Sequence, residues 1–211
     1  SLALAKKYVD FPKYLIIAHG FNATSGQMPV LLLGALFNAS TVGLFSLTQR
    51  VMSAPMSLVA AAIGDVFRQE ASQAYIQEGN CKTIYQRTFI RLLVVALVPF
   101  SAFYFLSPML FAWVFGERWR VAGEYAQILT PMLFMQFITS PLSAMFMIAE
   151  KQRLDLIWQM ILLALVIGSF ILGALANGVT ETLQIFTVAY CLAYVVNGLM
   201  SYSFAKNNRG K

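Results

Sequence analysis

Six apolar segments, each near the roughly 20 residues that cross a bilayer core, constrain this chain more than any other feature. They lie at about residues 14–37, 42–67, 89–114, 125–149, 154–176 and 183–204. A globular core does not need apolar runs longer than about 18 residues. Only 11% of the 211 residues are charged, whereas soluble domains carry roughly 25%. The sequence therefore predicts an all-α integral membrane protein with six transmembrane helices.

The lysines and arginines divide unequally between the two sets of connections. Twelve of the 15 lie on one side, in the N-terminal stretch, residues 68–91, residues 150–155 and the C-terminus. Arg118 and Arg120 lie on the opposite side, and Arg50 lies inside the second segment. Because cytoplasmic connections carry the excess of basic residues, both termini are predicted to be cytoplasmic. This distribution accounts for the net charge of +6, so nucleic acid is not an expected partner.

The connection at residues 68–87 is long for a turn and mixes apolar residues with charged ones. We expect it to lie along the cytoplasmic surface as a short amphipathic helix. Just before it, Asp65 and Arg68 are three residues apart, a spacing that brings two side chains together on a helix. The sequence predicts an ion pair between them.

Stripes of small and polar residues distinguish the first two helices from the other four. In the first, His19, Asn22, Gly26 and Pro29 recur at spacings of three and four and so share one face. The stripe on the second helix comprises Gly43, Ser46, Arg50, Ser53, Ser57 and Gly64. A polar group in hydrocarbon needs a partner or water, so we expect these faces to look at each other or at a cavity.

Arg50 is the most informative of these residues because it lies about eight residues from the non-cytoplasmic end of its segment. An arginine at mid-membrane costs roughly 2.5–3.5 kcal/mol on insertion scales. One interpretation is that its planar fork of donors binds an anionic headgroup such as a pyrophosphate. The other is a structural tie to backbone carbonyls, or a side chain that reaches the nearer interface.

The remaining candidate residues have two readings each. His19 is a candidate for proton coupling, because an unperturbed histidine titrates near physiological pH, or else a hydrogen-bonded packing residue. Asn22 and Gln27 could bond sugar hydroxyls, but amides also hold helices together in lipid. The predicted cavity-lining, substrate-binding set is Arg50, Asn22, Ser46, Ser53, Gln27 and His19.

The sequence carries no signature of an enzyme. It has no glycine-rich phosphate loop, no metal-ligand cluster and a single histidine. We therefore predict no catalytic residues, no metal and no cofactor. A membrane glycosyltransferase would need acidic catalytic residues, and Glu117 and Glu124 are the only candidates on the outer side.

Several motifs resemble those of a known family. They are Asp10-Phe11-Pro12, Val42-Gly43-Leu44-Phe45, the turn from Val114 to Ala126, Pro141-Leu142-Ser143 and Glu150-Lys151-Gln152. In order and spacing they resemble the C-terminal half of the polysaccharide flippases. These are the lipid-linked oligosaccharide (O-antigen) exporters of the multidrug/oligosaccharidyl-lipid/polysaccharide superfamily. His19-Gly20 is not a feature of that family.

The resemblance implies that residues 1–211 form one six-helix lobe of a transporter of 12–14 helices, with an N-terminal lobe absent from this chain. The polar stretch before the first segment, which shows no signal peptide, suits an internal part of a longer protein. The implied substrate is an undecaprenyl-pyrophosphate-linked oligosaccharide, flipped from the inner to the outer leaflet of the bacterial cytoplasmic membrane by alternating access. Polysaccharide polymerase machinery is an implied partner.

Two other classes of transporter remain as alternatives. The main one is an ion-coupled drug or metabolite antiporter of the same superfamily, which an acidic cluster in the absent lobe would favour. The membrane domain of an ABC exporter is the other. Its helices would extend far into the cytoplasm, but the turn at residues 150–155 is too short for that.

Overall fold

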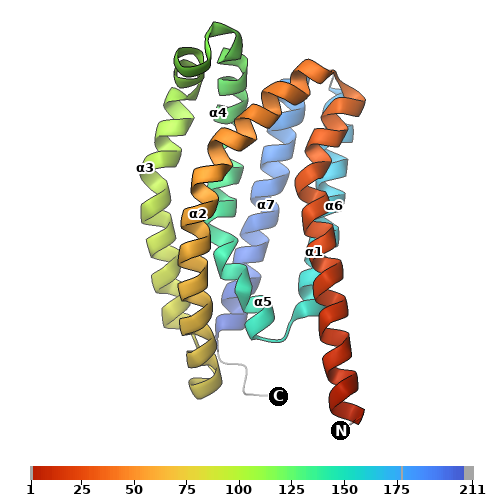
Figure 1. The fold of residues 1–211 in the computed structure, drawn as a ribbon, viewed down its shortest axis with the longest axis vertical. Coiled ribbons are helices and arrows are strands. Elements are labelled where there is room, and N and C mark those ends of the chain that lie inside the picture. Colours follow the sequence, from red (N-terminus) through yellow and green to blue (C-terminus); the bar gives the residue numbers. More distant parts are fainter. Residues whose placement is uncertain (1, 177, 207–211) are drawn as a thin grey trace.

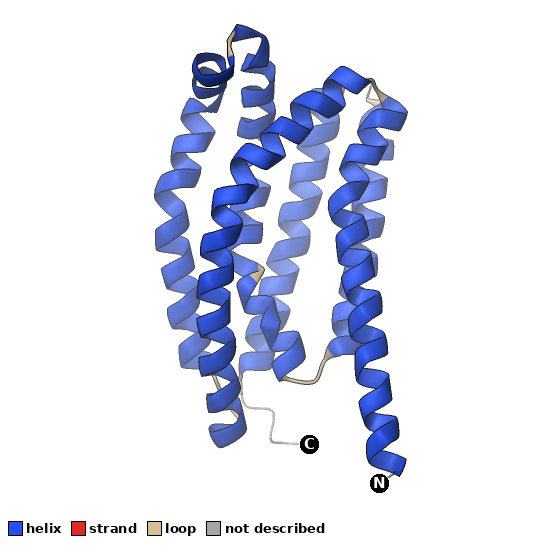
Figure 2. Ribbon diagram, viewed as in Figure 1, coloured by secondary structure: helices blue, strands red, loops and turns tan. Residues whose placement is uncertain are grey.

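The structure of the chain, a computed structural model, describes residues 2–176 and 178–206, with side chains at residue 17 and from residue 20 onward. The described range is almost entirely helical and contains no β-strand (Figure 2). Its helices are α1 (Leu2–Leu36), α2 (Ala39–Glu78), α3 (Lys82–Phe115), α4 (Arg120–Thr139), α5 (Met145–Ile148), α6 (Gln152–Leu175) and α7 (Val179–Ala205). Two short 3-10 turns, η1 (Glu117–Trp119) and η2 (Pro141–Ala144), flank α4.

The predicted membrane segments, apart from the fourth, fall within these helices to within one residue. Five helical stretches of the described residues are long and apolar enough to cross a bilayer: Ala39–Glu78, Lys82–Phe115, Glu117–Ile148, Gln152–Leu175 and Val179–Ala205. α1, which contains the first predicted segment, is 35 residues long. The fold class predicted from the sequence, all-α and multi-pass, is confirmed.

The helices pack in an order that differs from their order in the chain. α3 lies along α4, α4 along α7, α7 along α6, and α6 along α1. α2 packs mainly on α4, and Figure 1 shows it leaning across the bundle near its start and running parallel to α3 further down. The start of α1 and the end of α7 lie at the same end of the bundle (Figure 1). Fully buried phenylalanines from four helices fill the core: Phe45, Phe67, Phe111, Phe170 and Phe186.

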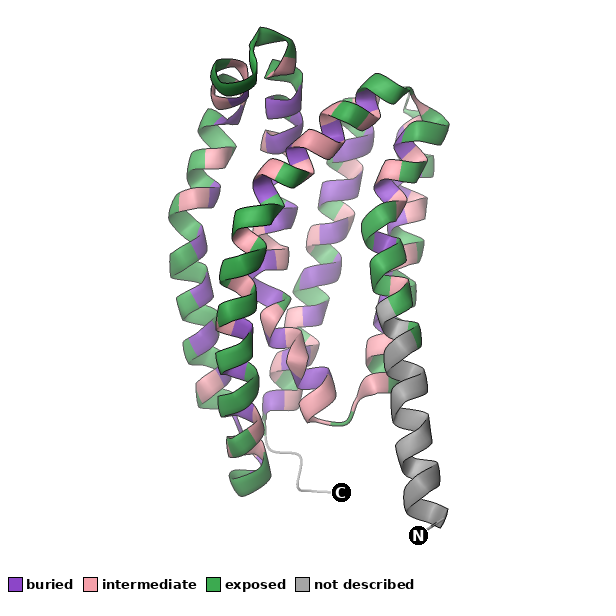
Figure 3. Cartoon of the chain, in the orientation of Figure 1, coloured by how far each residue is buried: buried purple, intermediate pink, exposed green. Residues whose placement is uncertain are grey.

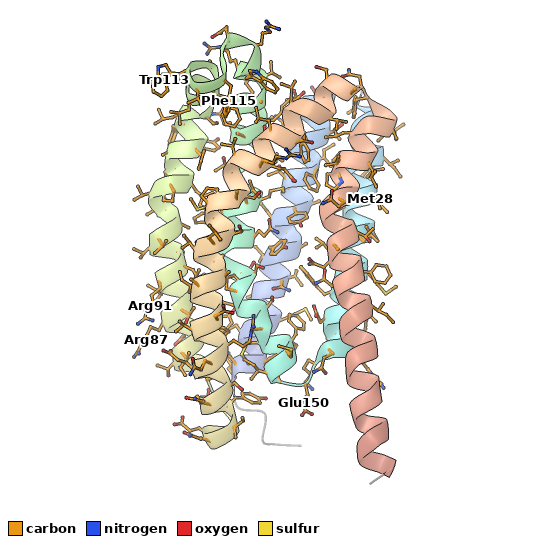
Figure 4. The ribbon with its side chains drawn as sticks, in the orientation of Figure 1. Met28, Arg87, Arg91, Trp113, Phe115 and Glu150 are labelled. Atoms are coloured by element: carbon orange, nitrogen blue, oxygen red, sulfur yellow. The ribbon has the colours of Figure 1, made fainter. Side chains whose placement is uncertain are left out.

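Large apolar side chains also cover the outside of the bundle, most clearly along α3 (Figure 3). Val98 is 75% exposed and Phe105 is 74% exposed. Near the far end of α3, Trp113 and Phe115 are exposed (Figure 4), as is typical of aromatic rings at a membrane interface. In water such a surface would drive aggregation, whereas in a bilayer it faces lipid. The chain is a multi-pass membrane protein.

The predicted surface helix at residues 68–87 is wrong. α2 instead continues without a break to Glu78, 40 residues in all. The stretch after Arg68 contains no glycine or proline before Gly79, and the buried side chains of Phe67 and Ala71 lie one turn apart, so packing and propensity both extend the helix. Gly79 ends it with a left-handed backbone (φ 69°), and its N–H donates to the carbonyl of Tyr75.

The fourth predicted segment, residues 125–149, is not one continuous helix. α4 ends at Thr139, and the chain then forms η2 and the single-turn α5. Pro141 has no N–H to donate to the carbonyl four residues earlier, so the α-helical ladder stops there. The resulting irregular backbone lies inside the bundle beside α2 and α7, where buried non-helical segments of membrane proteins are tolerated.

Candidate functional site

A cavity of about 500 Å³ lies beside this break in the helix. One wall is α2 from Met52 to Arg68, and the opposite wall is formed by α4, η2 and α5. Asp155, in the first turn of α6, lies at its edge. Because Arg68 and Asp155 come from the ends of helices nearest the termini (Figure 1), the cavity occupies that half of the bundle. The polar residues that line it are Ser53, Ser57, Asp65, Arg68, Gln136, Ser140, Ser143 and Asp155.

The polar stripe predicted on the second helix forms part of the α2 wall. Ser53, Ser57 and Gly64 all line the cavity. The Ser57 hydroxyl donates to the carbonyl of Ala54 at 2.8 Å, and the Ser53 hydroxyl donates to the carbonyl of Gln49. A hydroxyl that donates within its own helix keeps lone pairs with which to accept a bond from another group. This wall can therefore accept hydrogen bonds from sugar hydroxyls.

The ion pair predicted between Asp65 and Arg68 is confirmed. An Nη of Arg68 lies 3.6 Å from an Oδ of Asp65, and both side chains are more than half exposed. An exposed pair of this kind contributes little to stability. Its consequence for the cavity is electrostatic, because each charge offsets the other at the wall.

Arg50 lies just beyond the cavity on the same side of α2. It is three residues before Ser53 and seven before Ser57, so the three side chains share a helix face. Arg50 is exposed and forms no hydrogen bond or ion pair with any side chain that the structure describes. It is therefore a cation at the cavity margin whose fork of donors is available to an anionic group.

Asn22 is positioned by α6 and does not line the cavity. Its amide donates to Oε1 of the buried Gln159 at 3.1 Å. The amide of Gln159 in turn lies 3.4 Å from Oδ1 of Asp155. These bonds join α1 to α6 and reach the cavity edge through Asp155. The arrangement agrees with the reading of Asn22 as a tie between helices.

The other predicted residues are placed apart from the cavity. Ser46 is half-buried on α2, one turn before Arg50, and Gln27 is exposed on α1. His19 lies in α1, but its side chain is outside the described residues. The substrate contacts assigned to these three residues and to Arg50 and Asn22 stay predictions.

Sequence reasoning missed part of the cavity wall. Gln136, Ser140 and Ser143 face it from α4 and η2, and Asp155 faces it from α6. Gln136 left a signal, because it is an amide within a predominantly apolar segment. Ser140 and Ser143 flank Pro141, and only the break in the helix turns them toward α2.

Among the described residues, no group of three or more His, Cys, Asp or Glu side chains could hold a metal ion. Comparison with protein families gives one match. The profile of a family described as polysaccharide biosynthesis protein matches residues 1–124, more than half of the chain. The match takes in α1, α2, α3 and the start of α4, including the whole α2 wall of the cavity. No curated protein and no solved structure matches the chain.

Proposed function

Because the chain belongs to the polysaccharide biosynthesis protein family, a family of transporter type, we propose that it flips a lipid-linked oligosaccharide across the bacterial cytoplasmic membrane. The proposed substrate is an undecaprenyl-pyrophosphate-linked repeat unit, moved from the inner to the outer leaflet for surface polysaccharide synthesis. The observation that supports this most is the pairing of a hydroxyl-lined cavity with Arg50 at its margin. Hydroxyls suit the sugar, and a guanidinium suits the pyrophosphate.

The charges around the cavity favour Arg50 as the phosphate ligand. Arg68 also lines the cavity, but Asp65 lies 3.6 Å from its guanidinium. Arg50 has no such carboxylate among the described residues. In a membrane an unpaired cation is costly, so a substrate anion, water or another protein segment has to compensate it.

We propose alternating access as the mechanism, with this chain as the C-terminal lobe and a second six-helix lobe facing the α2 wall. If the termini are cytoplasmic, as the basic residues predict, the described cavity opens toward the cytoplasm and would receive substrate from the inner leaflet. The exposed polar side chains of Arg50 and Gln27 would then face the second lobe and the aqueous path, where polar groups in membranes are tolerated.

Export by Arg50 variants tests the proposal. Arg50→Ala should abolish surface polysaccharide in a complementation assay while the protein still accumulates in the membrane. Arg50→Lys keeps the charge but loses the bidentate fork, so it should restore export only in part. Arg118→Ala, which removes an exposed arginine at the opposite end of the bundle, is the matched control and should export normally.

Normal export by the Arg50→Ala protein would refute the role of Arg50. Loss of export together with loss of the protein would indicate a structural role instead. Measuring protein accumulation in parallel separates these two outcomes.

A further inference from the structure

A second hollow, a groove of about 600 Å³, lies between α3 and α7 with α4 as its floor. It is lined by Tyr85, Gln86, Phe89, Ile90, Met135, Thr139, Tyr194, Val195, Gly198, Leu199 and Tyr202. Polar groups gather at the end near the start of α3 and the end of α7. The deeper part is apolar, with Phe89, Ile90, Val195 and Leu199 as its walls.

The groove and the substrate cavity lie on different faces of α4. Leu133, Gln136 and Phe137 line the cavity, whereas Met135 and Thr139 line the groove. At about 100° per residue, the centres of these two sets lie about 130° apart around the helix. The groove therefore opens to the outside of the bundle, where large apolar side chains such as Ile90 and Leu199 are more than half exposed.

The mouth of the groove is a fixed polar structure. The Tyr85 hydroxyl donates to the carbonyl of Gly198 at 2.9 Å, and the Gln86 amide donates to the Tyr202 hydroxyl at 3.2 Å. The Lys206 ammonium lies 4.7 Å from the centre of the Tyr202 ring. Tyrosines and lysines of this kind are typical of the headgroup level of a bilayer.

The charged side chains that α3 and α7 place at the mouth are both basic. Lys82, in the first turn of α3, is three and four residues before Tyr85 and Gln86 and so lies below them on the same face. Lys206 lies on the other side of the mouth, at the end of α7. α3 has no acidic residue along its length, and the acidic residue of α7, Glu181, is in its first turn at the far end.

We propose that this groove binds an anionic phospholipid of the leaflet that faces the chain termini. Lys82 and Lys206 bind the phosphate, and Gln86 and Tyr202 bind the glycerol region. One acyl chain lies against Phe89, Ile90 and Leu199. Basic pockets between membrane helices recognise anionic headgroups in this way. The basic side chains of α3 and α7 at headgroup level, above an apolar groove that faces lipid, favour a phospholipid over a protein helix.

Native mass spectrometry of the purified chain tests this site, with phosphatidylglycerol and phosphatidylcholine of identical acyl chains as probes. Phosphatidylglycerol should bind more tightly. Each basic residue near the headgroups is worth about 1 kcal/mol, or about fivefold in affinity. Lys82→Gln/Lys206→Gln should therefore weaken phosphatidylglycerol binding about 25-fold and leave phosphatidylcholine binding nearly unchanged.

Arg87→Gln/Arg91→Gln is the matched control, because it removes two charges from the same end of α3. Arg87 and Arg91 lie about 200° around the helix from Tyr85 and Phe89, and they project outward in Figure 4. This double variant should change the affinity less than about threefold. An equal loss in both double variants would mean general attraction to a basic surface and would overturn the site.

Leu199→Trp tests the apolar part, because it fills the groove and leaves both lysines in place. It should weaken the binding of both lipids. Unchanged binding by this variant, or equal binding of the two lipids by the unaltered chain, would overturn the proposal. None of these substitutions touches the substrate cavity, so polysaccharide export by the variants reports on the proposed function separately.

Discussion

The pairs α3–α4 and α1–α2 are both joined by short connections, but their helices relate differently. α3 and α4 are in close contact at Gly123, where a Cβ would lie 2.5 Å from the Cα of Pro108. The Ser107 hydroxyl donates to the carbonyl of Gly123 at 2.9 Å, which fixes the same contact. On α1 and α2, a Cβ added to Gly26 or Gly43 would meet no described atom within 4 Å.

The difference shows that small residues serve close helix packing in one pair but not in the other. At Gly123 the absence of a side chain allows two backbones to approach, which is how membrane helices associate. On α1 and α2, Gly26 and Gly43 border open space, so the packing of this chain does not require glycine at these two positions. For Ser53 and Ser57 of α2, which line the cavity, we propose a role toward the substrate instead.

The largest expected effect is on the tight pair. Gly123→Val should displace α3 from α4, because its side chain would meet backbone atoms that cannot move aside, at a cost of about 3 kcal/mol. The variant should fail to accumulate in the membrane or lose its thermal transition. Gly26→Val is the control and should accumulate normally, because valine is no less favourable than glycine in a helix. Equal stability of the Gly123→Val and Gly26→Val proteins would mean that α3–α4 and α1–α2 do not differ in how closely they pack.

A bulky residue in the open region should affect transport and leave the fold intact. Ser57→Trp should fill the cavity and reduce polysaccharide export to background, with normal accumulation of the protein. Ser101→Trp, at an exposed position on α3, places the same side chain against lipid and should export normally. Normal export by the Ser57→Trp protein would mean that the cavity is not on the substrate path.

The smallest effect is expected where the α1–α2 pair is tied to the rest of the bundle. Asn22→Leu removes the hydrogen bond to Gln159. Single hydrogen bonds between membrane helices contribute about 0.6 kcal/mol on average, so unfolding in denaturant should shift only slightly. The stability lost in the double variant Asn22→Leu/Gln159→Leu should not exceed the sum of the losses in the two single variants. A loss of several kcal/mol would make this bond a main support of α1.

The sequence was sufficient for most of the spans, because hydropathy decides which stretches cross a bilayer, but not for the break at Pro141. It was also sufficient for the Asp65–Arg68 pair, which depends on spacing within one helix. It was insufficient beyond Arg68, where charged residues suggested a surface segment. The buried side chain of Ala71 shows that this stretch packs on the bundle as part of α2.

The cavity was only partly predictable for a related reason. Ser53 and Ser57 follow the period of one helix, so their shared face can be read from the sequence. Gln136 and Asp155 join them through tertiary packing, which no single-helix pattern encodes. Gln159 was missed because its partner, Asn22, lies 137 residues away in the chain.

Photo-crosslinking of substrate tests the account most directly. A photoreactive residue at Ser53, on the α2 wall of the cavity, should capture lipid-linked oligosaccharide in cells that make it. The same residue at Ser101, on the exposed surface of α3, should not. Adding Arg50→Ala to the protein that carries the photoreactive residue at position 53 should abolish the adduct. Equal capture at both positions, or an adduct at Ser53 that persists without Arg50, would contradict a substrate site at the α2 wall.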